Sequence, residues 1–358
     1  PQFVSNEPSL MLVEGTARSN IDAWEYEKVE GGHQYTSEFA RVVITVNPWH
    51  VYFYDTDGKL LTSTVHRTDV TNTFTPVTPF SYVRRASDYS RSYAASMSLS
   101  PGEKIFGFGE SFTQFNKRGS KVVLWVDDAN GTQNETMYKP IPFFMSSRGY
   151  GVFMHHSSPI SVDVGKFYNP VNTMMIGDDE LDLFFFVGEP KDILNEYTNL
   201  TGKAPMPPLW SFGFWMSRIT YFSAQDGYDV IEKLRDYEVP ADVLHFDTGW
   251  FGVDWRADYT FPAERFPDPQ KMINDFKEEG FHISLWQLPY MTPQNKLYDE
   301  LVENGFAIKD RKGNLPVEDA IIDFSNPAAV KWYQDKLRPL LEMGVGAIKV
   351  DFGEAAPE

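Results

Sequence analysis

The chain has 358 residues, 42% of them hydrophobic, and a formal net charge of −18, so it can bury a sizeable core and is expected to hold more than one domain. Its acidic surface repels phosphate backbones and anionic lipid, and it contains no run of about 18 apolar residues, so nucleic acid and membrane are both disfavoured as partners. Cysteine is absent, which excludes disulfides, thiolate catalysis and zinc–cysteine sites.

The first half of the chain is predicted to be an antiparallel β-sandwich. Between about residues 9 and 187, short apolar segments alternate with turns, and many short strands at such spacing are typical of two packed sheets. Asp57 and Gly58 form an Asp-Gly pair, which is a strong hairpin signal. The expected strands are residues 41–46, 50–54, 60–62, 151–155 and 181–187.

A domain boundary is expected at residues 202–208. Pro205, Pro207 and Pro208 fall within four residues, and prolines so close together favour an extended linker over helix or strand. The predicted domains are therefore residues 1–204 and 205–358.

The second half changes to a rhythm of strand, loop and helix, which predicts a parallel sheet with crossover helices. Strands are expected at residues 212–216, 242–247, 282–286 and from 347 onward. Helices are expected at residues 225–236, 268–279, 295–304 and 327–342, with Ser223 capping the first of them. A (β/α)8 barrel needs eight strands and only four are found, so we expect the N-terminal part of a longer polypeptide.

The last of these strands carries the most informative pattern. Lys349 and Asp351 alternate with apolar residues, so both charged side chains share one face of the strand. Charged residues are rarely buried unless they are paired or functional, and catalytic side chains of β/α barrels sit at the carboxyl ends of strands. A plain ion pair that closes a barrel strand is the alternative.

Five segments in order along the chain resemble glycoside hydrolase family 31, most closely its bacterial α-xylosidase branch. The resemblance covers nearly all of the chain from about residue 41. Its motifs are residues 106–110 with 117–119, residues 138–144 with 147–152, residues 207–213, residues 245–247 and residues 349–354.

The resemblance implies a retaining exo-acting α-glycosidase. Asp351 would be the nucleophile that forms a covalent glycosyl-enzyme, and the nearby Lys349 would favour its ionised form. The acid/base Asp of the family lies well downstream of the nucleophile, so it is expected beyond Glu358. Glu354, three residues past the nucleophile, is expected to be structural.

Other pocket residues carry over by motif. Asp247 would accept hydrogen bonds from hydroxyls at the far end of the −1 sugar, with a strand-end cap as the alternative. Trp286 and Trp250 would form a pocket wall, with core packing as the alternative. Asp128 falls where this branch extends a sandwich loop over the active site, and an exposed acidic turn is its alternative.

The sequence departs from the α-xylosidase pattern after Asp247. The compared enzymes carry a Cys and a bulky Phe that crowd C5 of the sugar, whereas this chain has Thr248 and Gly249. The glycine would leave room for a hydroxymethyl group and Thr248 would offer a hydroxyl, so a hexose, an α-glucoside or α-galactoside, is favoured over a substrate limited to α-xyloside.

Three other functions stay open. The same nucleophile could serve an α-transglycosylase or an α-glucan lyase, and a non-catalytic carbohydrate-binding protein would also fit the sandwich and the 15% aromatic content. An oligosaccharide or glycoside is the expected partner, and no metal or cofactor is expected because a carboxylate pair does this chemistry unaided. A homo-oligomer stays open. The sequence also leaves localisation undecided between cytoplasm and secretion after signal removal.

Overall fold

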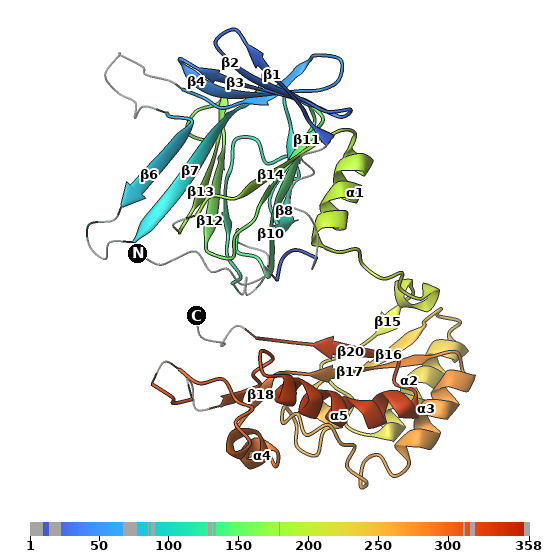
Figure 1. Ribbon diagram of the computed structural model, residues 1–358. Helices are drawn as coiled ribbons and strands as arrows, with labels where there is room; N and C mark the ends of the chain where they lie inside the picture. The colour runs from blue at the N-terminus through green and yellow to red at the C-terminus, as the bar shows by residue number, and fades with distance from the viewer. Residues whose placement is uncertain are drawn as a thin grey trace. The chain divides into compact units, whose positions relative to one another are not determined.

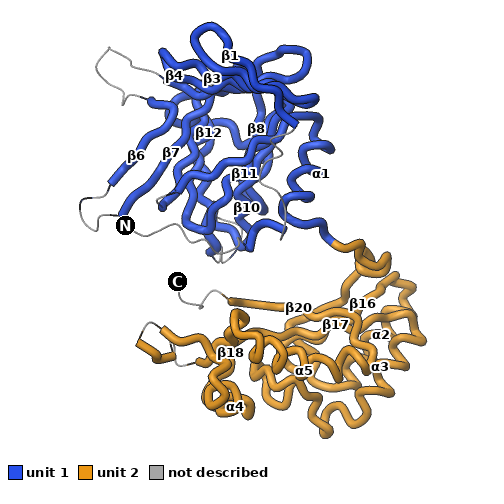
Figure 2. The backbone as a smooth tube through the Cα atoms, in the orientation of Figure 1, with its two compact units in different colours: residues 1–204 blue, residues 205–358 orange. Residues whose placement is uncertain are grey.

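The computed structural model describes residues 10–13, 23–66, 77–84, 86, 90–127, 131, 134–178, 180–310, 312–315 and 319–353. The chain divides into two compact units, residues 1–204 and 205–358, which Figure 2 colours separately. Each unit has its own hydrophobic core. Within the described ranges, no helix is both long and apolar enough to cross a membrane.

Among its described residues, the first unit contains three antiparallel sheets and one helix (Figure 1). One sheet has the order β1-β2-β3-β4-β5, with β1 Glu25–Val29, β2 Gly32–Thr36, β3 Arg41–Val46, β4 Trp49–Tyr54 and β5 Leu60–Ser63. A second has the order β14-β11-β10-β8, with β8 Ile105–Glu110, β10 Lys139–Ser146, β11 Tyr150–Met154 and β14 Leu183–Val187. The third has the order β6-β7-β13-β12-β9, with β6 Phe80–Arg84, β7 Arg91–Ser98, β9 Lys121–Leu124, β12 Ile160–Val164 and β13 Val171–Ile176.

The second and third sheets pack face to face as the predicted sandwich. Successive side chains of a strand point to opposite faces, so Phe144 of β10 enters the core between the sheets while Phe143 faces the helix α1 (Pro190–Thr201). Gly151 of β11 lies where α1 approaches closely, since a Cβ there would stand 2.7 Å from Cγ2 of Ile193. The sheet β14-β11-β10-β8 thus buries side chains on both of its faces.

The second unit is a four-stranded parallel sheet with crossover helices, in the order β15-β16-β17-β20 (Figure 1). The strands are β15 Trp215–Met216, β16 Val243–Phe246, β17 His282–Gln287 and β20 Ala347–Val350. The helices are α2 Ala224–Asp236, α3 Pro269–Glu278, α4 Tyr298–Glu303 and α5 Pro327–Met343. Between β17 and α5 in the sequence, two short strands form an antiparallel pair, β18 Tyr290–Met291 and β19 Ala320–Ile321. The predicted fold, a sandwich followed by the first strands of a β/α barrel, is confirmed.

The sheet of the second unit has an apolar face and a face that carries polar side chains. Leu244, Leu285 and Ile348 belong to the core that also contains residues of α2, α3 and α5. His245 is paired in register with Ser284, and Trp286 with Lys349. By the two-residue period of a strand, these four side chains lie on the opposite face from the apolar ones.

Local signals explain where two helices begin and end. Ser223 caps α2 in a reciprocal capping box with Asp226, as its sequence position predicted. Helix α5 begins with Asn326 as its cap and Pro327 in its first turn, and it ends at Gly344, whose φ of 106° suits glycine.

Several elements are shorter than predicted, and β15 and α4 differ most from the prediction. The strand expected at 212–216 is limited to Trp215–Met216, since Phe212 belongs to the 3-10 helix Leu209–Phe212 and Phe214 N donates to the Asp242 carboxylate at 3.2 Å. Helix α4 begins at Tyr298, since Asn295 uses its side chain to accept from Leu297 N in a turn.

Candidate active site

Polar side chains converge at the carboxyl ends of the parallel strands. Asp247 follows β16, Trp286 lies near the end of β17, and Asp351 follows β20 and donates its backbone N–H to Gln287 O at 3.0 Å. Parallel strands place their carboxyl ends along one edge, the edge that holds catalytic groups in β/α barrels. We call Asp247, Trp286, Lys349 and Asp351 the strand-end site.

Asp351 is held by three donors and is still accessible. Its Oδ2 accepts from Trp286 Nε1 at 2.7 Å and lies 3.2 Å from Lys349 Nζ, while Oδ1 accepts from Phe352 N at 3.2 Å. Burial alone would raise the pKa of Asp351, but the hydrogen bonds from Trp286 and Lys349 and the charge of Lys349 lower it below its ordinary value. The carboxyl is therefore ionised near neutral pH, with 36% of the side chain exposed.

Lys349 joins the two carboxylates of the site. Its Nζ lies 3.2 Å from Oδ2 of Asp247 and 3.2 Å from Oδ2 of Asp351. Burial would lower the pKa of Lys349, but its hydrogen bonds and the two negative charges raise it above its ordinary value. The ammonium form is stable, and it sets one cation between two anions.

Asp247 has little acceptor capacity left for a ligand. Its Oδ2 accepts from His245 at 2.8 Å and from Lys349 at 3.2 Å, and its Oδ1 accepts from Thr248 N at 3.1 Å. A carboxylate offers about four acceptor positions. Among the contacts of the described residues, one position on Oδ1 stays free, enough for one sugar hydroxyl rather than two.

His245 was not singled out from the sequence, and it is a buried neighbour of the strand-end site. Its side chain is 8% exposed, and its Nδ1 lies 2.9 Å from Ser284 Oγ while Nε2 faces Asp247. Burial lowers the pKa of His245 despite the neighbouring carboxylates. Its position two residues before Asp247, on the same strand face, is the signal that could have found it.

The aromatic residues near Asp351 differ in their exposure. The Trp286 ring is fully buried, yet its N–H reaches Asp351, and it packs edge-on against Trp255 and Phe352 with centroids 5.4 and 6.5 Å away. Trp255 and Phe352 are about half exposed and have φ of 67° and 61°, which is rare for bulky residues and common at functional sites. Trp250 lies in the core, where its Nε1 donates to Trp286 O at 2.8 Å.

The region after Asp247 is closed. Thr248 Oγ1 is buried, with no hydrogen-bond partner among the described residues. It is therefore not an accessible hydroxyl beside Oδ1 of Asp247. A Cβ at Gly249 would lie 2.2 Å from Thr220 Oγ1 and 3.0 Å from the Phe222 ring. Thr220 and Phe222 therefore occupy the space beside Gly249, and the expected room for a hydroxymethyl group is filled on that side.

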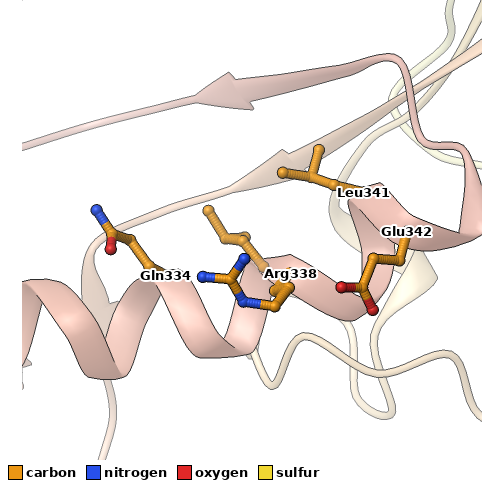
Figure 3. Close-up of a pocket in the computed structure, with 5 residues that line it drawn as sticks. Gln334, Arg338, Leu341 and Glu342 are labelled. Carbon is orange, nitrogen blue, oxygen red and sulfur yellow. The ribbon is translucent and has the colours of Figure 1, made fainter.

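Asp128 falls outside the described residues, and Trp125, just after β9, is partly exposed in the first unit. No group of three or more potential metal ligands occurs in the portion of the chain that the structure describes. A hollow of about 400 Å³ lies on α5, and none of the strand-end residues lines it; Figure 3 shows the side chains that do. It is lined by Gln334, Leu337, Arg338, Leu341 and Glu342.

Two family models match the sequence. The TIM-barrel domain of family 31 glycosyl hydrolases matches residues 204–358, and the N-terminal galactose mutarotase-like domain of glycosyl hydrolase 31 matches residues 4–163.

Curated relatives include α-xylosidases. The chain is 37% identical over 273 residues to α-xylosidase XylQ of Lactiplantibacillus pentosus and 36% identical over 272 residues to an α-xylosidase of Emericella nidulans. These matches cover 73% and 74% of this chain and 35% of each relative, so the chain spans about a third of their length. An isomaltosyltransferase of Sporosarcina globispora is 26% identical, with 95% of this chain and 34% of the relative covered.

Solved structures share the fold. A Flavobacterium johnsoniae GH31 dextranase complexed with glucose superposes with a TM-score of 0.82 at 23% identity, covering 99% of this chain and 43% of the other. A GH31 α-xylosidase from a soil metagenome, complexed with xylose, gives 0.79 at 22% identity, covering 99% and 52%.

Proposed function

The chain belongs to glycoside hydrolase family 31, and we propose that it is the nucleophile-bearing part of a retaining, exo-acting α-glycosidase. The single observation that supports this most is the state of Asp351. It is an accessible carboxylate at a strand end, and Trp286 and Lys349 lower its pKa. A nucleophilic carboxylate must be ionised to attack, which is the condition that these contacts maintain.

The first half-reaction is proposed to use Oδ1 of Asp351. Oδ2 already accepts from Trp286 and Lys349, whereas Oδ1 accepts only the 3.2 Å bond from Phe352 N among the described residues. Oδ1 would form a bond to the anomeric carbon while the bond between that carbon and the leaving oxygen breaks. The leaving oxygen would take up a proton. Water would then release the sugar from Asp351.

The proton donor is proposed to be a carboxyl beyond Glu358, about 5 Å from Asp351 as retaining enzymes require. Asp247 is poorly suited to this role, because it accepts hydrogen bonds from His245, Lys349 and Thr248. It is suited instead to accept one hydroxyl of the −1 sugar through Oδ1. The family's two-carboxylate chemistry would then depend on a longer polypeptide.

The substrate is proposed to be a glycoside with a terminal α-linked xylose, glucose or galactose. The α-xylosidase relatives and the α-glucosidase 2 of Bacillus thermoamyloliquefaciens, 26% identical over 338 residues, support the first two sugars. Because Thr220 and Phe222 fill the space beside Gly249, the glycine no longer favours a hexose over xylose.

Covalent trapping tests the nucleophile directly. A 5-fluoro-α-glycosyl fluoride needs no acid to expel fluoride, so the full-length enzyme should gain the mass of one fluoroglycosyl group, mapped by peptide sequencing to Asp351. Xylosyl, glucosyl and galactosyl probes, used side by side, report the −1 preference. The Asp351→Ala variant should stay unlabelled. Labelling of a different residue, or of Asp351→Ala, would contradict the proposal.

Transglycosylation is the second candidate, because the isomaltosyltransferase relative covers 95% of this chain. Both reactions share the glycosyl-enzyme and differ in the acceptor that resolves it. Product analysis with and without added oligosaccharide separates them, since a transglycosylase forms longer products in preference to free sugar. A non-catalytic carbohydrate-binding protein would bind sugars equally well after Asp351→Ala and would show no trapping.

A further inference from the structure

A chain of hydrogen bonds crosses the sheet behind the strand-end site. Ser284 Oγ lies 2.9 Å from Nδ1 of His245, whose Nε2 lies 2.8 Å from Oδ2 of Asp247. The same Oδ2 of Asp247 lies 3.2 Å from Nζ of Lys349. We propose that His245 is a positioning residue, which donates Nε2–H to Asp247 and thereby keeps Oδ1 of that carboxylate aimed at a sugar hydroxyl. The inference rests on the proposed function of the site.

Geometry selects one tautomer of His245. An ionised carboxylate only accepts hydrogen bonds, so the ring nitrogen that faces Asp247 must carry the proton. The ring is neutral near pH 7 because burial lowers the pKa of His245, so Nδ1 is then a pure acceptor. Ser284 is fully buried and paired in register with His245, and its hydroxyl supplies the hydrogen that Nδ1 needs.

The consequence for Asp247 is a fixed orientation. His245 and Lys349 both hold Oδ2, and Thr248 N holds one side of Oδ1. Without the His245 bond, the carboxylate would keep only the ammonium and the adjacent backbone N–H, and it could rotate about its Cβ–Cγ bond. Oδ1 would then present its free acceptor position in variable directions.

Two substitutions of His245 form a matched pair. Gln places its amide nitrogen near the position of Nε2, whereas Asn places its amide nitrogen near that of Nδ1. In the full-length enzyme, His245→Gln should keep kcat/KM within a few-fold of wild type. His245→Asn should lose about 10- to 100-fold, the usual effect of removing a hydrogen bond to a charged group.

A deoxy substrate separates positioning from mere structural support. With an aryl α-glycoside that lacks the 4-hydroxyl, at the far end of the sugar, the difference between His245→Asn and wild type should largely disappear. A structural role would lower kcat/KM for both substrates equally, and that result would overturn the proposal. An unchanged kcat/KM in His245→Asn would overturn it as well.

The tautomer gives a test that is independent of turnover. A 15N–1H long-range correlation spectrum of the wild-type enzyme at pH 7 should show His245 as the Nε2–H form, with the signal assigned by its absence in His245→Gln. An Nδ1–H or doubly protonated ring would overturn the inference even if His245→Asn fails to fold. If wild type hydrolyses no glycoside and is not trapped at Asp351, the proposed function fails, and this spectrum still decides the tautomer.

Discussion

At the carboxyl end of β20, the ammonium of Lys349 lies 3.2 Å from the carboxylates of both Asp247 and Asp351. Each carboxylate also receives a hydrogen bond from a ring N–H, from His245 and Trp286 respectively. Two anions near each other in a partly buried site repel one another, and a shared cation offsets that repulsion. The charge state of Asp351, the proposed nucleophile, therefore depends on Trp286 of β17 and Lys349 of β20.

Lys349→Met removes the charge and keeps most of the side-chain length. Because Lys349 contributes to the lowered pKa of Asp351, its loss should raise that pKa. Activity requires the ionised carboxylate, so the acid limb of the pH profile of kcat/KM should move to higher pH. Near neutral pH, kcat/KM should fall by at least about tenfold, since two carboxylates then lack their shared partner.

The control for that experiment is Lys349→Arg, which keeps the positive charge and should move the acid limb less. Initial rates measured between acid and neutral pH in the full-length enzyme give both profiles. Coincident acid limbs for wild type and Lys349→Met would show that Lys349 does not control the ionisation of Asp351.

At the scale of elements, Arg265 connects the loops that follow two neighbouring strands. Its guanidinium donates to Phe222 O at 2.8 Å, in the loop after β15, and to Gly249 O at 2.7 Å, in the loop after β16. It also donates to Phe251 O and, at 3.4 Å, to Gly252 O. A planar group with five N–H donors suits such a cluster of carbonyls. By these hydrogen bonds, Arg265 stabilises the packing of Phe222 and Thr220 against Gly249.

Arg265→Lys should reduce the free energy of unfolding by about 2 kcal/mol, because an ammonium cannot reproduce the fork and leaves carbonyls unpaired. Urea unfolding followed by tryptophan fluorescence measures the change. Lys331→Ala is the matched control, since it removes an exposed ion pair with Asp335 on α5 and should change stability by less than about 0.5 kcal/mol. Equal changes in the free energy of unfolding for the two variants would contradict this role of Arg265.

At the scale of the whole molecule, the chain is two units with separate cores joined by an exposed segment. Residues 202–209 are all exposed, and Met206 is almost fully so. Helix α1 ends at Thr201 and the 3-10 turn of the second unit begins at Leu209. An exposed connection without regular structure is a preferred site of proteolysis.

Limited digestion with trypsin should therefore cut first after Lys203, before any site within the sheets. Mass spectrometry should show fragments of residues 1–203 and from Ala204 onward, and circular dichroism of the purified first fragment should retain its β signal. Lys203→Gln should delay the cut. Early cleavage inside the sandwich would show that the first unit is not the independently stable body that its core predicts.

Most elements, and the alternation of residues within them, could be predicted from the sequence. Strand 41–46 was predicted at its observed bounds, Ser223 caps α2, and the common face of Lys349 and Asp351 followed from the two-residue period. The order of sandwich and parallel β/α elements followed as well. These features are local, because hydrophobic period, turn residues and caps act over a few positions.

Which side chains contact one another could not be predicted, because these contacts join residues far apart in the sequence. Lys349 lies 102 residues from Asp247, and His245 meets Ser284 through the register of β16 and β17. Thr220 fills the space beside Gly249 from another loop, a contact that no spacing in the sequence indicates. Strand register and loop packing result from the burial of the whole apolar face, so the partners of the polar face are set at long range.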